Sequence, residues 1–102
     1  MSKKTVELSS KRKVQIREMG QDEIDSCHDT QYIVYVNGRP DHYANQMKAR
    51  TAWLRKGIVG GDFKTFKTGI DGYPEDCVLK ELKESEKNEL SDLIQEFQGL
   101  GE

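Results

Sequence analysis

The sequence has few of the residues that would form a large hydrophobic core or cross-link it with disulfides. Of its 102 residues two are cysteine, two are proline and 34% are apolar. Leu, Ile, Val and Phe supply 22 residues, just above the ~20% level below which disorder becomes common. The cysteine count excludes a disulfide scaffold, and no apolar run approaches the ~18 residues of a membrane span. The first residues also lack a signal peptide's apolar stretch, so we expect a cytoplasmic protein with no membrane association.

Residue types that hold metals or perform catalysis are equally sparse. Cys27, Cys77, His28 and His42 show no ligand-pair spacing, and we expect Cys77 to pack as a small apolar residue. Cys27 beside His28 is the only nucleophile–base pair, and sequence neighbours rarely face each other in a catalytic site. Gly60-Gly61-Asp62 lacks the rest of a phosphate-binding loop and indicates a hinge. We therefore expect no catalytic residues, no metal and no cofactor.

Charged residues make up 33% of the chain, and their distribution is uneven although the net charge is only −2. Residues 1–67 carry a net charge of +5, whereas residues 68–102 carry −7. The two parts could attract each other within one domain, pair between copies in a homo-oligomer, or bind different partners.

The first third of the chain has the alternating pattern of β-strands. Val6 and Leu8, then Val14 and Ile16, alternate with polar residues on either side of a polar stretch, which predicts a β-hairpin with one apolar face. The acidic stretch 21–29 favours a short helix. Residues 32–36 are all β-branched or aromatic and predict a third strand, with a continuing helix as the alternative.

Three helices are predicted in the remainder. Asp41 can cap a helix over 42–56 that Gly57 ends. A short helix over 74–82 follows, and Ser85 can cap a last helix that ends at Gly99. The apolar stripes at helical spacing are Tyr43, Met47, Thr51 and Leu54 in the first helix, and Leu90, Leu93, Ile94 and Phe97 in the last. The fold class expected for residues 1–102 is a single small α+β domain, in which a hairpin of two or three strands packs with about three helices.

Five glycines interrupt apolar residues between positions 57 and 73, which predicts a flexible, irregular segment. Its apolar residues are too many for a solvated linker. They either close the small core or bind a partner, and replacing Phe63 and Phe66 with Ser would separate the two. The candidate partner-binding residues are Trp53, Ile58, Val59, Phe63, Phe66 and Tyr73.

Nucleic-acid binding is a weaker alternative. Basic residues of the first 67 positions could follow a phosphate backbone, and Tyr32, Tyr35, Phe63 and Phe66 could stack on bases. The sequence pI of about 5.7, the acidic last third and the absence of a module motif argue against it.

The residues from Thr5 to Met19 (TVELSSKRKVQIREM) resemble the opening of phage tail assembly chaperones, which begin with a V-x-L hairpin continuing into V-x-I/V-R-E. The helix containing Thr51-Ala52-Trp53-Leu54-Arg55, the following Gly-containing loop and the Leu-rich last helix are also similar in outline. Such chaperones are non-enzymatic cytoplasmic proteins that oligomerise and bind the tape measure protein and tail tube subunits before assembly. The resemblance therefore implies a transient chaperone or adaptor with protein partners in a bacterial host. A permanent head or tail connector component and a small nucleic-acid-binding regulator remain as alternatives.

Overall fold

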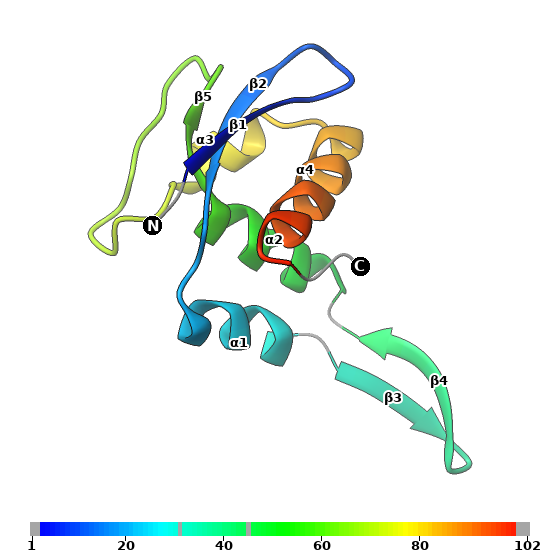
Figure 1. Ribbon diagram of the computed structural model, residues 1–102. Coiled ribbons are helices and arrows are strands. Elements are labelled where there is room, and N and C mark those ends of the chain that lie inside the picture. The colour runs from blue at the N-terminus through cyan, green and yellow to red at the C-terminus, as the bar shows by residue number, and fades with distance from the viewer. Residues whose placement is uncertain (1–2, 31, 45, 100–102) are drawn as a thin grey trace.

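The computed structural model describes residues 3–30, 32–44 and 46–99. In this part of the chain five strands and four helices follow one another (Figure 1). The elements are β1 (Lys3–Glu7), β2 (Lys13–Arg17), α1 (Gln21–Thr30), β3 (Tyr32–Val36), β4 (Arg39–Ala44), α2 (Gln46–Gly57), β5 (Ile58–Gly61), α3 (Asp76–Lys80) and α4 (Glu84–Phe97). The expected α+β class is confirmed.

The first sheet has three antiparallel strands in the order β1-β2-β5. Val6 pairs with Val14, and Ile16 pairs with Ile58 of β5, so apolar residues of all three strands lie on one face. Successive side chains in a strand point to opposite faces, which is why the alternation in the sequence produces this face. The predicted hairpin and its buried residues Val6, Leu8, Val14 and Ile16 are confirmed.

One hydrophobic core joins this face to the helices. The periodic residues of α4 behave as predicted, since Leu90 and Ile94 are fully buried and Leu93 and Phe97 pack partly against the core. α2 and α4 contact each other at Gly57, where a Cβ atom would lie 2.7 Å from the Ile94 Cγ2. Glycine is therefore needed here so that the two helices can approach.

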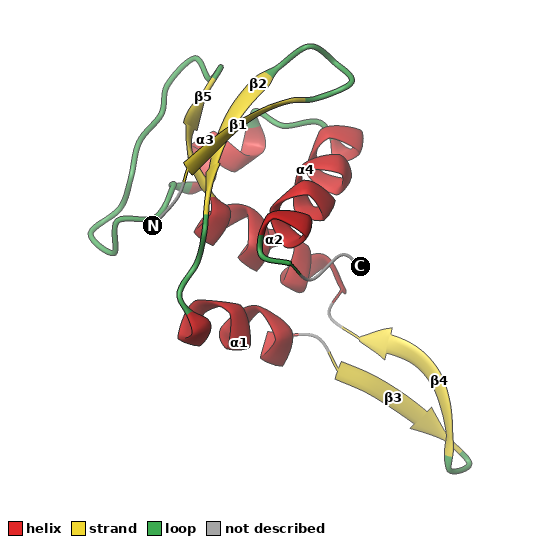
Figure 2. Cartoon of the chain, viewed as in Figure 1, coloured by secondary structure: helices red, strands yellow, loops and turns green. Residues whose placement is uncertain are grey.

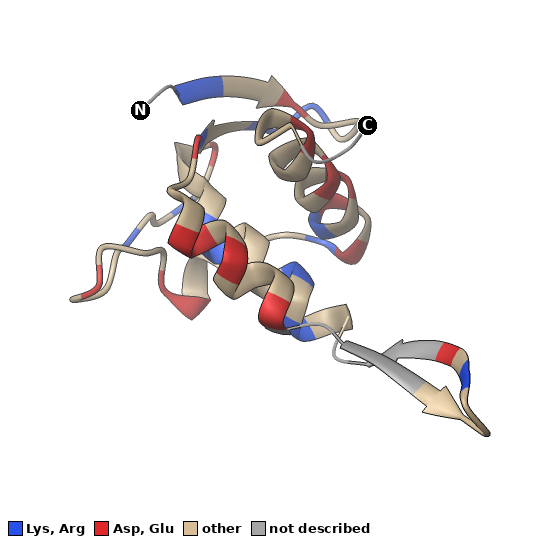
Figure 3. Cartoon of the chain, turned by 60° about the horizontal axis from the view of Figure 1, so that its bottom comes forward, with Lys and Arg blue, Asp and Glu red and all other residues tan. Residues whose placement is uncertain are grey.

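Ion pairs inside the fold join the basic first part of the chain to the acidic last part. Arg12 pairs with Glu86, Arg50 with Glu84, and Arg55 with Asp76. Each pair joins the basic first part of the chain to the acidic last part, which confirms the interpretation that the two attract each other. Acidic residues recur along α1 and α4 (Figure 3).

β3 and β4 form a separate two-stranded ribbon that extends away from the body (Figures 1 and 2). The predicted strand at 32–36 is confirmed, but it does not join the first sheet. The helix predicted over 42–56 was wrong at its start: residues 39–44 form β4, and α2 begins at Gln46. Pairing across the Asn37-Gly38 turn decides this, because both residues have the positive φ that a tight hairpin turn needs.

The shorter helix changes which residues face the core. Met47 is 59% exposed and Thr51 is half-buried, although both were expected on the apolar stripe. The buried residues of α2 are instead Ala49, Trp53, Leu54 and Gly57. The prediction of an irregular segment from Gly57 onward was wrong for its first residues, because Ile58–Gly61 is strand β5. The last helix begins at Glu84 after Lys83, so Ser85 is not its cap.

Candidate functional site

The loop between β5 and α3 crosses the surface of the body and is held at several points. Phe63 and Phe66 pack against each other, with ring centroids 5.7 Å apart, and partly against the core. The guanidinium of Arg12 lies 5.5 Å from the centre of the Phe63 ring. The backbone N–H groups of Lys64 and Thr65 donate to the Glu81 carboxylate at 2.8 and 3.3 Å. The first half of this loop is thus tied to the body by both apolar and polar contacts.

The second half of the loop folds into a tight tip around Ile70. The N–H of Gly69 donates to the carbonyl of Tyr73 at 2.8 Å, and Thr68 forms a β-bridge with Pro74. Gly72 has a φ of +82°, which a residue with a side chain rarely adopts. Ile70 is fully exposed at the end of this turn, so an apolar side chain is held in solvent by a hydrogen-bonded tip.

Tyr73 fastens the base of the tip to helix α1. Its hydroxyl donates to the Glu23 carboxylate at 2.5 Å, and Arg17 of β2 forms an ion pair with the same carboxylate. The hydrogen bond from Arg17 contributes most to lowering the pKa of Glu23 to about 2, and the Tyr73 hydroxyl adds to it. The bond to Glu23 in turn raises the pKa of Tyr73. The cluster joins the loop, α1 and β2 with charge-assisted bonds.

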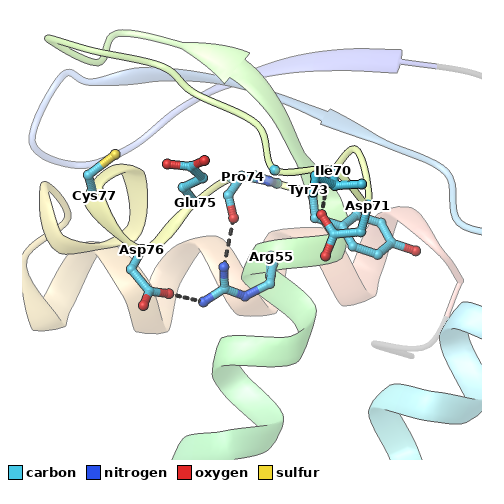
Figure 4. A pocket seen from close by; sticks show the side chains of 9 residues that line it. Arg55, Ile70, Asp71, Tyr73, Pro74, Glu75, Asp76 and Cys77 are labelled. Carbon is cyan, nitrogen blue, oxygen red and sulfur yellow. Dashed lines mark hydrogen bonds and ion pairs between the residues drawn. The ribbon is translucent and has the colours of Figure 1, made fainter.

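An open hollow of about 770 Å³ lies beside the tip (Figure 4). Arg55 of α2 crosses it, donating to the Pro74 carbonyl at 2.7 Å and pairing with Asp76, whose pKa this pairing lowers. The other charged side chains that line the hollow, Asp71 and Glu75, are acidic. A surface that combines the exposed Ile70 with surplus negative charge can contact an apolar group that has a cation next to it.

The six candidate residues from the sequence fall into two groups. Trp53 and Ile58 are 4% and 2% exposed and belong to the core, so they present no surface to a partner. The other four are half-buried in or beside the loop: Val59, Phe63, Phe66 and Tyr73. Of these four, Tyr73 fastens the tip, and Phe63 and Phe66 pack the first half of the loop against the body. The apolar residue of the segment that is fully exposed is Ile70, which sequence reasoning did not select. Its position as a lone apolar residue between glycines and an aspartate was the available signal.

Other exposed apolar side chains lie outside this segment. Met47 at the start of α2, together with Tyr35 and Val36 at the end of β3, are each about half exposed or more. The sequence placed Met47 in the core stripe and considered Tyr35 as part of a strand and as a base-stacking residue. The exposure of Met47 follows from where α2 begins.

Three of the four residues considered for metal binding or catalysis, Cys27, Cys77 and His28, have side chains that the structure describes, and the side chain of His42 lies outside the described residues. Cys27 is fully buried, and burial raises the pKa of its thiol, which disfavours the nucleophilic thiolate. The His28 ring meets the Trp53 ring edge-on, with centroids 5.4 Å apart. Cys77 is exposed, contrary to the expectation that it packs. Within the described ranges, no three His, Cys, Asp or Glu side chains are grouped closely enough to hold a metal ion.

Comparison with known proteins gives no relative: no family model, curated protein or solved structure matches this chain. None of the helices described here combines the length and apolar character that crossing a bilayer requires.

Proposed function

We propose that this protein is a non-catalytic binding protein that covers an apolar surface of a partner during assembly. The observation that carries the proposal is Ile70, a fully exposed apolar side chain at the tip of a loop fastened to the body. Solvent exposure of an isoleucine costs free energy, and binding an apolar surface recovers about 1.5–3 kcal/mol. Because the tip is already ordered by its hydrogen bonds, little conformational entropy is lost on binding.

The charges around Ile70 indicate the chemistry of that partner. Arg55 is already bound to Asp76 and to the Pro74 carbonyl, while Asp71 and Glu75 leave the hollow acidic. A complementary surface has an apolar patch beside a lysine or arginine. Such a contact is small, and small interfaces suit transient binding.

The hairpin resemblance favours phage tail proteins as the partners. In this proposal the protein is a tail assembly chaperone or adaptor that binds tail tube or tape measure proteins in the cytoplasm of a bacterial host and then leaves. The rest of the surface is strongly charged, which keeps a protein with an exposed apolar tip in solution.

Co-expression with each candidate tail protein, followed by affinity capture, tests the proposal. The wild-type chain is expected to retain the tape measure or the tube protein, and Ile70→Ser is expected to weaken that binding about tenfold, since about 1.4 kcal/mol of apolar contact is lost. Lys67→Ser, an exposed change on the same loop, serves as the control for general disturbance of the loop.

Four outcomes would count against the proposal. If neither tail protein is retained, or if Ile70→Ser binds as the wild type does, the apolar tip is not the binding site. Finding the chain in mature particles would favour a permanent connector component over a chaperone. A gel shift of DNA that weakens as salt rises would favour the nucleic-acid alternative.

A further inference from the structure

The β3–β4 ribbon has two open edges. In the described part of the chain, neither strand pairs with any strand other than its neighbour in the ribbon. Figures 1 and 2 show the ribbon extending from the body, and the molecule measures 48 × 29 × 27 Å along its principal axes. A two-stranded ribbon by itself is marginally stable in water, and a third or fourth strand stabilises it.

The two edges differ in their chemistry. β4 contains Arg39, Pro40 and Asp41, and charges and proline are the residues that discourage pairing at an edge. β3 is Tyr-Ile-Val-Tyr-Val, without a charge, a proline or a glycine. Tyr35 and Val36, at its outer end, are 61% and 49% exposed. The β3 edge therefore lacks the features that protect β4.

The register of the ribbon indicates which backbone groups of β3 point outward. Pro40 pairs with Tyr35. Because proline has no N–H to donate, it fits in a sheet where that group would face the open edge. In an antiparallel pair, opposite residues direct their backbone groups to the same side of the ladder, inward or outward. Tyr35, and by alternation Ile33, are then expected to direct their N–H and C=O groups to the open edge of β3.

We propose that a second copy of this chain pairs its β3 with this edge, antiparallel and about a two-fold axis through Val34. Ile33 of each copy then exchanges backbone hydrogen bonds with Tyr35 of the other, and the two Val34 residues face each other. The result is a four-stranded sheet in the order β4-β3-β3-β4. This surface is separate from the Ile70 tip, so both can be occupied at once.

Self-pairing is favoured because of what two-fold symmetry requires. In such an interface each residue meets residues of the same patch, so a charge near the axis meets its own copy and is repelled. β3 has no charge to create this repulsion, whereas an antiparallel β4 pair would bring Asp41 close to Asp41. With five residues a strand, the interface is short and the dimer is expected to dissociate in the micromolar range or above.

Sedimentation equilibrium over a concentration series measures the association directly. We expect a mass that rises with concentration from 11.7 kDa to twice that value. Val34→Lys places two ammonium groups across the axis and is expected to raise the dissociation constant at least about tenfold. Arg39→Glu on β4 alters the net charge more than Val34→Lys does, but Arg39 does not lie on the edge that pairs. The dissociation constant of the Arg39→Glu dimer should therefore match that of the wild type. Circular dichroism of each variant checks that the helices are retained.

Disulfide trapping tests the register. In a Cys77→Ser background, Val34→Cys should form an intermolecular disulfide on oxidation, because facing residues without mutual hydrogen bonds have Cα atoms about 4.5 Å apart. Val36→Cys is the matched control. Its two copies would be four residues apart along the strand, about 13 Å, which is too far to bridge.

The proposal is overturned if the wild-type chain stays monomeric up to a protein concentration of about 1 mM, because a dimer with a dissociation constant above that value would be too weak to matter. A dimer that Val34→Lys leaves intact, or that Val36→Cys traps as well as Val34→Cys does, would place the interface elsewhere. If the chain is monomeric alone and Val34→Lys abolishes capture of a tail protein, the occupant of the edge is that partner's strand and not a second copy.

Discussion

Arg12 and Glu86 form an ion pair between the first hairpin and helix α4, with 2.9 Å between the Arg12 Nε and the Glu86 Oε2. Glu86 is only 3% exposed, and it also accepts bonds from the Ser10 hydroxyl and the Lys83 backbone N–H. Burial alone would raise the pKa of Glu86. The N–H of Lys83, the Ser10 hydroxyl and the Arg12 guanidinium outweigh it and lower the pKa to about 2.

Glu86→Gln is expected to destabilise the fold at neutral pH by about 2–3 kcal/mol. It removes a carboxylate whose pKa falls from 4.5 to about 2 on folding, and this fall measures how much the native state favours the charged form. A carboxylate whose pKa is lower in the folded state contributes its full stabilisation above its unfolded pKa. That contribution is lost as the pH falls through about 4.5 towards 2.

Urea unfolding at a series of pH values measures this effect. The wild type should lose stability steadily from about pH 5 to pH 2, and Glu86→Gln should lose less over the same interval. Glu96→Gln, an exposed change on the same helix, should follow the wild-type curve. Equal pH slopes for the wild type and Glu86→Gln would show that Glu86 is not the group responsible.

Tyr73→Phe is expected to loosen the loop tip while leaving the core intact. It removes the hydroxyl that donates to Glu23 and keeps the ring, so the expected loss is about 1 kcal/mol or slightly more. Hydrogen exchange should speed up at Gly69 and Gly72, whose N–H groups are bonded within the tip, and not in α4. Unchanged exchange at the tip would mean that Tyr73 does not fasten it.

Gly57→Ala should destabilise the protein by about 1–3 kcal/mol through overpacking, because the new Cβ would lie within 3.0 Å of three side-chain atoms of Ile94. One of these atoms is the Ile94 Cδ1, at 2.8 Å. Ile94→Val removes it, so the double variant should be more stable than the sum of the single changes predicts. Thermal unfolding of all four proteins supplies the cycle, and strict additivity would contradict the close contact.

Cys77 is expected to react with a thiol reagent in the native protein, and Cys27 only on unfolding. Cys77 is exposed, whereas Cys27 is fully buried with a raised pKa. Mass spectrometry should show one modified thiol in buffer and two in denaturant. Rapid modification of Cys27 in buffer would mean that the region around α1 opens readily.

Local sequence features were sufficient to predict several of the elements. The hairpin of β1 and β2 and the buried face of α4 are readable from period-two and helical spacing, since each pattern reflects which side of an element meets the core. Composition indicated helix α1 through its acidic residues and strand β3 through its β-branched and aromatic residues. The short helix α3 lies within the range expected for it, although it is shorter.

Long-range pairing was not readable in this way. β5 is a strand because Ile58 pairs with Ile16 of β2, which lies forty-two positions earlier in the chain. Met47 was expected in the core because its spacing suits a longer helix. The pairing of residues 39–44 with β3 shortens that helix and leaves Met47 exposed.

The sequence by itself determined the small core, the excess of charge and the identity of most strands and helices, because these follow from composition and from local periodicity. Only the tertiary structure decided which apolar residues remain outside. Trp53 and Ile58 are buried, while Ile70 is left exposed and the outer edge of β3 pairs with no other described strand. The reason is that a core of limited area can cover only some of the apolar residues, and the packing of distant segments selects them.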